Sequence, residues 1–573
     1  MTSQTEQLPC LLLNKVFNKP ALKPCDTILG DSDSSTFAPA SLDVQTHLGA
    51  TLSSLDENES SDAEANVEPS CTRQNAFGCG SNGSHRELIQ GYSVLGESSL
   101  ASERGNKRHV ARRVMIVHTM GSIPSKALRL LIETEDKIDQ HYSLDQDSLG
   151  KGAFGVVKKA TLRASGAVRA VKIIAKQSMK ERLYRLKEEI EIMKLIDHPN
   201  LLMLYEIFED SDNLYLALQM CAGGHVQGYV EKNGMLSEVQ AGVVMRQVLL
   251  AVCYLHKQHI CHRDLKAENC LLQTKGRIQK CNVKVADFGL SCQIAPGEYL
   301  KTTAGTLSHM APEVLARRYR FSCDVWSCGV MSYYLLSGQK PFDGTNREVI
   351  KSKIANHSVK FETIEWIDVS QPAMNFISEL LIKNPEHRCS AEQALVNDWL
   401  VRVVPKADEV RLWKDTLVKV MKFRKLSKLQ QAFLHVMASM VQDSEIETPR
   451  RFFMMTDNNG DGVISFNELS DALGVDMPTP GPENRDDLSY TEFLAATIDM
   501  KKHMRSELLR ATFSSFDKNG DGALSVSEIS GGKLLGAMSV DELIEEMEKV
   551  DLDGDGDLSW NEFRHMMSSV MKI

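Results

Sequence analysis

The stretch LGKGAFGVV, residues 149–157, places Gly150, Gly152 and Gly155 in the spacing G-x-G-x-x-G. Glycine at these positions lets backbone N–H groups approach phosphate oxygens that a Cβ atom would keep away. By itself the spacing is a weak signal, because a tight turn between two strands also produces it. The surrounding sequence therefore decides whether this stretch binds a nucleotide.

After the glycine-rich stretch come RAVK (169–172), CHRDLKAEN (261–269), ADFGL (286–290) and MAPE (310–313). The order and the intervals of these motifs are typical of protein kinases. Between residues 142 and 400 the apolar pattern predicts strands followed by long helices. This region resembles the protein kinase family, which implies a bilobal protein-kinase fold and transfer of the ATP γ-phosphate to a protein.

The segment CHRDLKAEN contains most of the expected catalytic residues, because phosphoryl transfer needs positioning and charge neutralisation more than covalent chemistry. The resemblance implies that Asp264 accepts the proton of the substrate hydroxyl and that Lys266 steadies the transferring phosphoryl group. A lysine at this position is typical of serine/threonine kinases. Asn269 and Asp287 offer oxygen ligands of the kind that Mg²⁺ prefers. We therefore expect ATP and Mg²⁺ to bind here, with Lys172 completing the catalytic set.

The nucleotide pocket is expected to form around Lys172, which the resemblance implies holds the α- and β-phosphates while Glu189 orients it. The other expected residues lie in the glycine-rich stretch, beside Lys172, or between the two lobes. Together the expected ATP-binding residues are Leu149, Gly150, Gly152, Gly155, Val157, Ala170, Lys172, Glu189, Gln219 and Cys221. Outside the pocket, Glu313 and Arg388 match an ion pair that kinases use inside the C-lobe, so we assign them to architecture.

The substrate-recognising segments depart from the family pattern. His225 in CAGGHVQ stands where relatives that recognise basic substrates carry glutamate, and Glu268 keeps one acidic contact. Ala267 replaces a common proline, and GTLSHMAPE lacks a tyrosine often found before APE. We expect a weakened preference for basic substrates.

The sequence leaves open whether the activation segment must be phosphorylated for activity. Arg263 beside Asp264 usually implies phosphorylation of that segment, because a phosphate neutralises the arginine. Thr302 and Thr303 lie in the right place, but Glu298 could supply negative charge without modification.

Three twelve-residue stretches, 457–468, 517–528 and 551–562, have the EF-hand pattern, with oxygen ligands at positions 1, 3, 5 and 12, a carbonyl at position 7 and glycine at position 6. The expected Ca²⁺ ligands are Asp457, Asn459, Asp461, Val463, Glu468, Asp517, Asn519, Asp521, Ala523, Glu528, Asp551, Asp553, Asp555, Asp557 and Glu562. Three matches make a chance acidic turn a negligible alternative.

EF-hands normally pair, so a fourth is expected at 481–492. There Ser489 and Glu492 hold positions 9 and 12, but Gly481 holds position 1 and Asp486 replaces the glycine. We interpret it as a degenerate hand that pairs with the first without binding calcium well.

A basic amphipathic segment, KFRKLSKLQQAFLHVMASM at 422–440, lies between the kinase region and the EF-hands. Its large apolar residues step by three or four and predict one stripe of a helix: Phe423, Leu426, Leu429, Phe433, Val436 and Met440. This is the pattern of a calmodulin target, although a spacer helix is the simpler alternative. The adjacent EF-hands favour an intramolecular target, an autoinhibitory junction helix within 401–444.

The order of kinase, basic junction and EF-hands resembles the calcium-dependent protein kinases of plants and apicomplexan parasites, from residue 142 to the end. The family implies a junction that keeps the kinase off until calcium rearranges the EF-hand module. Two mechanisms stay open: the junction occludes the substrate cleft, or the calcium-loaded module braces an otherwise inactive kinase. A calcium-sensing pseudokinase scaffold is the competing function, and a kinase that binds separate calmodulin is a second alternative.

These features predict an α+β kinase domain at 142–400 and an all-α EF-hand domain at 445–573, preceded by a polar, disordered region at 1–105 and an extension at 106–141. A net charge of −10 gives no basic footprint for nucleic acid. No apolar run is long enough for a transmembrane segment, and Thr2 excludes N-myristoylation. We expect a cytoplasmic monomer whose cysteines are free thiols, with palmitoylation at Cys10 or Cys25 as a minor alternative.

Overall fold

The computed structural model describes residues 132–134, 137–152, 155–179, 183–404, 413–473, 487–499, 502, 507–531 and 538–570. All of them belong to one compact unit of the chain, which includes residues 121–573. The region 1–105, with Cys10 and Cys25, lies outside the described residues, and so does most of the degenerate loop.

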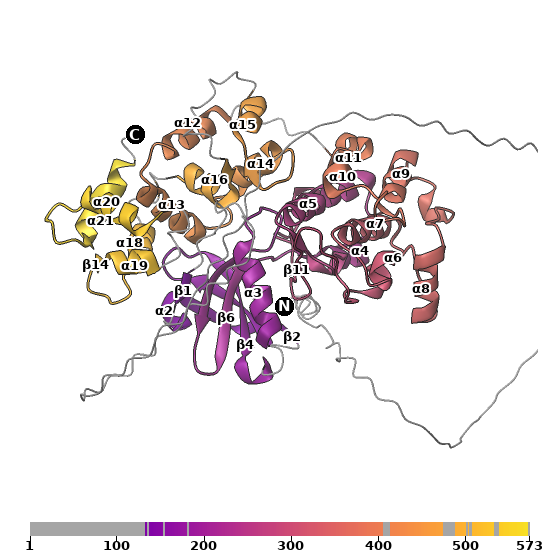
Figure 1. The fold of residues 1–573 in the computed structure, drawn as a ribbon, viewed down its shortest axis with the longest axis horizontal. Helices are drawn as coiled ribbons and strands as arrows, with labels where there is room; N and C mark the ends of the chain where they lie inside the picture. The colour runs from indigo at the N-terminus through magenta and orange to yellow at the C-terminus, as the bar shows by residue number, and fades with distance from the viewer. Residues whose placement is uncertain are drawn as a thin grey trace, which may run out of the picture. The chain divides into compact units, whose positions relative to one another are not determined.

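A six-stranded sheet forms the N-lobe, in the order β1-β5-β6-β4-β3-β2. Its strands are β1 (Ile132–Thr134), β2 (Tyr142–Gly152), β3 (Gly155–Leu162), β4 (Val168–Ala175), β5 (Leu204–Glu209) and β6 (Asn213–Gln219). Neighbouring strands are antiparallel except β1, which pairs in parallel with β5. β1 comes from the predicted extension at 106–141, so part of that extension adds an edge strand to the kinase sheet. Figure 1 shows α3 (Leu183–Leu195) beside these strands.

The C-lobe is built around α5 (Glu238–Lys257), which begins at a capping box of Ser237 and Gln240. The other helices of this lobe are α4 (Val226–Asn233), α6 (Pro312–Leu315), α7 (Ser322–Ser337), α8 (Arg347–Asn356), α9 (Gln371–Leu380), α10 (Ala391–Leu395) and α11 (Asp398–Val403). Its short strands are β7 (Gly224–His225), β8 (Ile260–Cys261), β9 (Cys270–Leu272), β10 (Val283–Val285) and β11 (Cys292–Gln293). In the described part of the chain, α5 alone is long and apolar enough to cross a membrane, but 72% of its apolar window is buried inside the protein. Its apolar character therefore serves the core.

Two pairs of EF-hands follow the junction. The first pair contains α14 (Glu447–Thr456), β12 (Val463–Ile464), α15 (Phe466–Leu473), β13 (Leu488–Ser489) and α16 (Tyr490–Thr497). The second contains α18 (Glu507–Ser514), β14 (Ala523–Leu524), α19 (Val526–Gly531), α20 (Val540–Glu548), β15 (Leu558–Ser559) and α21 (Trp560–Ser569). The short strands β12 and β13 pair with each other, as do β14 and β15. The predicted pairing of the degenerate hand with the first hand is thus confirmed.

The junction consists of two helices, α12 (Trp413–Phe423) and α13 (Lys428–Met440), so the prediction of one helix across 422–440 is wrong. The break occurs because Ser427 starts a new helix. Its hydroxyl accepts from Gln430 N at 3.2 Å, while its own N–H donates to Gln430 Oε1 at 3.1 Å. This S-x-x-Q capping box can be recognised in the sequence. The continuous spacing of apolar residues across it instead favours one uninterrupted helix.

The apolar stripe of the junction is buried in spite of the break. Phe433 on α13 is 0% exposed, and its ring makes edge-on contacts with Phe516 and Phe563 at centroid distances of 5.1 and 4.8 Å. Gln430 Nε2 donates to the carbonyl of Met566 at 3.1 Å. α13 also contacts α16, α18 and α20. The junction is therefore engaged by both EF-hand pairs.

His435 makes the stability of this packing depend on pH. Its Nε2 is buried without a hydrogen-bond partner among the described residues, and burial lowers the pKa of His435 to about 4. In the unfolded chain the imidazole titrates near 6.5, so below that pH the unfolded state gains a proton that the folded state does not. We expect His435 to cost about 2 kcal/mol of unfolding free energy between pH 6.5 and 5. The difference between the denaturant midpoints at pH 7 and pH 5 should be smaller in His435→Leu than in the parent chain; an equal difference in both chains would contradict this.

Candidate active site and calcium-binding loops

The ion pair that orients the ATP-binding lysine is present. Lys172 on β4 and Glu189 on α3 lie with Nζ and Oε1 3.6 Å apart, and the lysine side chain is 7% exposed. Gly289 borders the pair, because a Cβ there would lie 3.2 Å from Glu189 Oε2 and 3.4 Å from Asp287 Oδ1. The helix α3 therefore sits close enough to join the two lobes at the phosphate site.

The catalytic loop gathers the predicted residues around Asp264, which is 3% exposed. Lys266 Nζ lies 3.1 Å from Asp264 Oδ2, and Asn269 Nδ2 donates to the Asp264 carbonyl at 2.8 Å. Thr306 was missed from the sequence, although it lies in the segment GTLSHMAPE. Its Oγ1 donates to Asp264 Oδ1 at 2.7 Å and accepts from Lys266 Nζ at 2.8 Å. The carboxylate is thus held in one orientation.

The residues predicted for Mg²⁺ fit that role. Asn269 is 0% exposed, its amide nitrogen is bound to Asp264, and its Oδ1 has no hydrogen-bond partner among the described residues. An amide oxygen left in this state is suited to a metal ion. Asp287 has a φ of 70°, a left-handed conformation that is rare for a residue with a Cβ. Strain of this kind at the start of DFG indicates a functional constraint.

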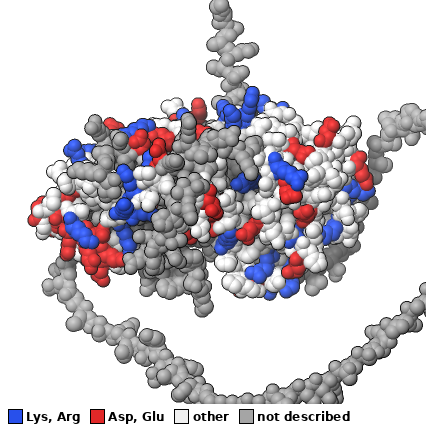
Figure 2. Space-filling model, turned by 90° about the horizontal axis from the view of Figure 1, so that it is seen from above, with Lys and Arg blue, Asp and Glu red and all other residues white. Residues whose placement is uncertain are grey.

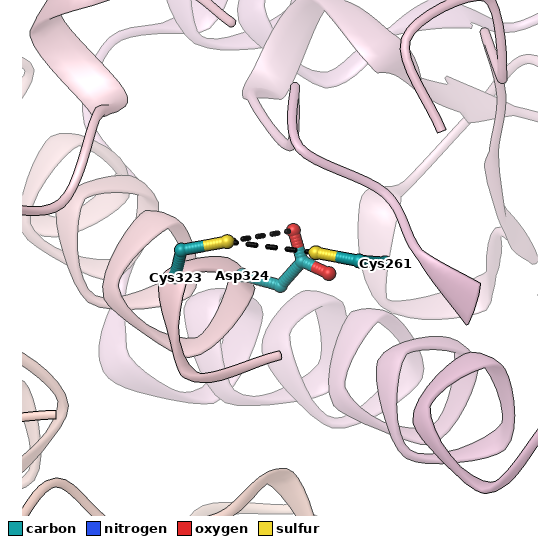
Figure 3. A group of neighbouring side chains, drawn as sticks. All are labelled: Cys261, Cys323 and Asp324. Atoms are coloured by element: carbon teal, nitrogen blue, oxygen red, sulfur yellow. Dashed lines mark hydrogen bonds between the residues drawn. The ribbon is translucent and has the colours of Figure 1, made fainter. Parts of the chain in front are cut away.

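Asp324 at the start of α7 holds the catalytic loop by hydrogen bonds. Its carboxylate accepts from the backbone N–H groups of His262 and Arg263, each at 2.8 Å, and lies 3.0 Å from His256 Nε2. Burial alone would raise the pKa of Asp324, but the His256 and His262 contacts lower it below its usual value. Figure 3 shows Cys261 and Cys323 facing each other here, with the sulfurs 3.5 Å apart. Because loop donors occupy the carboxylate, this group is structural.

The predicted ion pair of the C-lobe is present and buried. Arg388 Nη1 and Nη2 donate to Glu313 Oε1 and Oε2 at 2.5 and 3.0 Å. Arg388 also donates to the Ser322 carbonyl at 2.7 Å, at the start of α7. A bidentate pair of this kind fixes the segment after APE against the helix that carries Asp324.

The nucleotide pocket opens into a cavity of about 2050 Å³ that also borders α5, α11 and α14. The predicted residues on its wall are Leu149, Val157, Ala170, Gln219 and Cys221. The side chain of Gln219 is held by Asp443, with Nε2 donating to Asp443 Oδ1 at 2.9 Å. Burial raises the pKa of the Cys221 thiol to about 12. The thiol is therefore protonated at neutral pH.

The glycine-rich stretch forms the end of the β2–β3 hairpin, where Gly150 pairs with Val157 and Gly152 with Gly155. Gly155 has a second reason to be glycine. A Cβ there would lie 1.9 Å from the Ile173 carbonyl of β4. At this position the close approach of the next strand excludes a side chain.

His225 has a structural role that its sequence pattern did not suggest. It is 5% exposed and caps α4, with Nδ1 accepting from Gly228 N at 2.8 Å. The buried imidazole of His225 thus serves as a helix cap, while Glu268 remains partly exposed. The weakened basic preference stays a prediction.

The activation segment brings Thr302 to Arg263. Arg263 Nη1 donates to Thr302 Oγ1 at 3.4 Å, and Tyr319 Oη donates to the Thr302 carbonyl at 2.7 Å. Thr302 and Thr303 are both exposed. Of the two threonines, Thr302 is placed for a phosphate to reach Arg263, and control by phosphorylation stays a prediction.

The three calcium loops have the backbone shape that ligation requires. The glycine at position 6 has a φ of 79° at Gly462, 89° at Gly522 and 86° at Gly556. Residues with a Cβ rarely adopt such angles. The first aspartate of each loop accepts the N–H of that glycine, at 3.0, 3.1 and 2.9 Å in chain order. The position-1 carboxylates therefore point into their loops.

The donor sets also fit calcium. In the loop 551–562, oxygens of Asp551, Asp553 and Glu562 lie within 4.8 Å of one another. Acidic side chains gather over the EF-hand helices at the left of Figure 2. In the first loop Asp457 is 1% exposed, and burial, with the charge of Asp461, raises the pKa of Asp457 to about 7. Uncompensated carboxylates of this kind are suited to a divalent cation.

Comparisons with known proteins match both the kinase region and the EF-hand region. The family model "Protein kinase domain" matches residues 144–400, and "EF-hand domain pair" matches residues 446–531 and 505–568. The chain is 33% identical over 460 residues to calcium-dependent protein kinase 5 of Plasmodium falciparum, covering 77% of this chain and 80% of the relative. It is 32% identical over 450 residues to calcium-dependent protein kinase 3 of Plasmodium berghei (75% and 80%). It is 31% identical over 461 residues to calcium-dependent protein kinase 33 of Arabidopsis thaliana (78% and 88%). This chain is a serine/threonine protein kinase that belongs to the calcium-dependent protein kinase family.

Proposed function

We propose that calcium binding to the chain's own EF-hands activates this kinase, and that the loaded module acts by bracing the kinase domain. The supporting observation is the attachment of the junction to β4. Arg169 Nη2 donates to the carbonyls of Ser439 and Val441 at 2.8 and 3.3 Å, just where α13 ends. Arg169 is 1% exposed and lies three residues before Lys172 on the same strand. The junction is thereby linked to the strand that binds ATP.

Further contacts extend this attachment across the hinge to the C-lobe. Gln219 at the end of β6 donates to Asp443, which follows the junction. Arg450 on α14 donates from Nη1 to Gln273 Oε1 at 2.5 Å and lies 3.3 Å from Asp443. Because these contacts involve both lobes, they favour bracing over occlusion of the substrate cleft.

In the proposed reaction Asp264 accepts the proton of a serine or threonine hydroxyl as the oxygen attacks the γ-phosphate. Lys266 and Lys172 compensate the charge that spreads over the phosphoryl oxygens. Asn269 and Asp287 would hold Mg²⁺, which would supply positive charge to the ATP phosphates. The assembled catalytic set supports this over a pseudokinase scaffold. The monomeric state and the cytoplasmic location stay predictions.

Truncation after Val404 separates the two mechanisms. Bracing predicts a folded fragment with little peptide phosphorylation at any calcium level, because the contacts to Arg169, Gln219 and Gln273 are gone. Occlusion predicts full, calcium-independent activity. The measurement is phosphate transfer from Mg-ATP to a serine/threonine peptide, with nucleotide binding and thermal melting as controls for folding. An active fragment would rule out the brace.

A further inference from the structure

Asp197, in the turn between α3 and β5, binds the start of an EF-hand helix. Its carboxylate is 4% exposed and accepts twice from Thr491, from the backbone N at 2.9 Å and from Oγ1 at 2.6 Å. Thr491 is the second residue of α16, whose first turn leaves N–H groups without partners inside the helix. A carboxylate there is also favoured by the helix dipole. A kinase residue thus completes the cap of an EF-hand helix.

The EF-hand that binds Asp197 is the degenerate one. Comparison with the other three hands shows that this contact is specific to it. Thr491 holds position 11 of the loop 481–492 and is 9% exposed. Position 11 of the other three loops is occupied by Asn467, Ser527 and Asn561, all of them exposed. Among the four loops, the buried side chain at position 11 belongs to the one with Gly481 at position 1 and Arg485 at position 5.

The same turn is also attached to the first, calcium-binding hand. Asp197 N donates to Tyr254 Oη on α5 at 2.8 Å. The ring of Tyr254 lies against Gly462 of the first loop, where a Cβ would be 2.3 Å from Cδ2. Lys257, one turn further along α5, donates from Nζ to the Asn459 carbonyl of that loop at 3.0 Å. The turn after α3 thus contacts the degenerate hand directly and is linked to the first hand through Tyr254 of α5.

We propose that the degenerate hand has exchanged calcium binding for kinase binding, so that the Asp197–Thr491 contact transmits calcium occupancy of the first loop to α3. This inference rests on the proposed bracing function. The first loop and α16 are coupled because β12 pairs with β13, with Val463 opposite Ser489, the residue that caps α16. Asp197 is a positioning residue, since it acts through α3.

The consequence for catalysis lies at the phosphate site. Glu189 lies on α3, where it pairs with Lys172, and Asp197 lies in the turn that follows α3. Holding the end of α3 limits the movements that would separate this pair. When calcium leaves the first loop, β12 and β13 loosen, Thr491 loses its orientation toward Asp197, and α3 is released.

The test is a calcium titration of peptide phosphorylation by the full chain. Loss of one hydrogen bond to a charged group weakens docking roughly 10-fold. Three calcium ions drive this docking together, so the 10-fold weakening is divided among three binding steps. Thr491→Val should therefore raise the half-activating calcium concentration about two-fold. Asp197→Ala, which removes both bonds, should raise it about five-fold. Thr491→Ser keeps the hydroxyl and should behave like the parent chain.

The matched control is Thr497→Val on the same helix, whose hydroxyl donates only to the carbonyls of Phe493 and Leu494 in α16. It should leave the calcium response unchanged. In the Asp197→Ala chain, adding Thr491→Val should have no further effect, a result that a general loss of stability would not produce. Equal shifts for the two valine variants, or additive shifts in the double variant, would overturn the inference.

A second readout does not depend on activity. Amide hydrogen exchange of residues 488–495 in saturating calcium should accelerate in Asp197→Ala, because Thr491 N loses its acceptor. Unchanged exchange would overturn the inference even in an active enzyme. A parent chain that shows no calcium-dependent transfer would instead count against the proposed function, while the exchange result would still decide the contact.

Discussion

The Asp264→Asn variant is expected to lower kcat for peptide phosphorylation by about 10²–10⁴-fold, the usual contribution of a positioned base. The amide cannot accept the hydroxyl proton, while the shape of the site is kept. Thr306, which donates to Asp264 Oδ1 at 2.7 Å, can donate to the amide oxygen instead, and the 2.8 Å bond from Asn269 to the backbone carbonyl is unaffected. The measurement is steady-state phosphate transfer to a serine/threonine peptide in saturating calcium.

Asp398→Asn is the matched control for this substitution. Asp398 begins α11, its side chain is 87% exposed, and it pairs with Arg402 only on the surface. Such a pair contributes little to stability, so the control should retain full activity. If Asp264→Asn also retained full activity, the assignment of Asp264 as proton acceptor would be wrong.

Replacing the three position-12 glutamates, Glu468→Gln, Glu528→Gln and Glu562→Gln together, is expected to abolish calcium activation. Each glutamine loses the charge and the bidentate grip that complete a calcium site. A switch from 1:99 to 99:1 requires about 10⁴-fold preferential binding, or roughly 20-fold tighter calcium binding at each of three sites in the active state. Activity should therefore remain near its calcium-free level, about 100-fold below the activated parent.

Glu492→Gln supplies the control, because the degenerate loop is not expected to use its position-12 residue for calcium. Glu492 Oε2 accepts from Ser489 N at 2.8 Å in a capping box, and glutamine serves equally well there. The calcium dependence of phosphorylation should thus be unchanged. A triple variant that still responded to calcium, or a single variant that did not, would contradict the assignment of the loops.

The sequence alone determined the sites that short stretches build. The bond between Asn269 and the Asp264 carbonyl spans five residues, and each calcium loop needs twelve. Spacing and residue type therefore specified these geometries, along with the fold that their order implies. The break at Ser427 was equally local, and was missed because an apolar period can continue across two helices that bury one face.

Only the tertiary structure decided which distant segments meet. Arg169 reaches Ser439 across 270 residues, and Asp197 reaches Thr491 across 294. Neither spacing nor composition can pair such groups, because an arginine or a threonine has many partners of equal chemistry along the chain. The pairing follows from how the packed cores bring β4, the turn after α3 and the EF-hands together. Since a buried polar group must find a partner, that packing also selects the hydrogen bonds that join the junction and the EF-hands to the kinase domain.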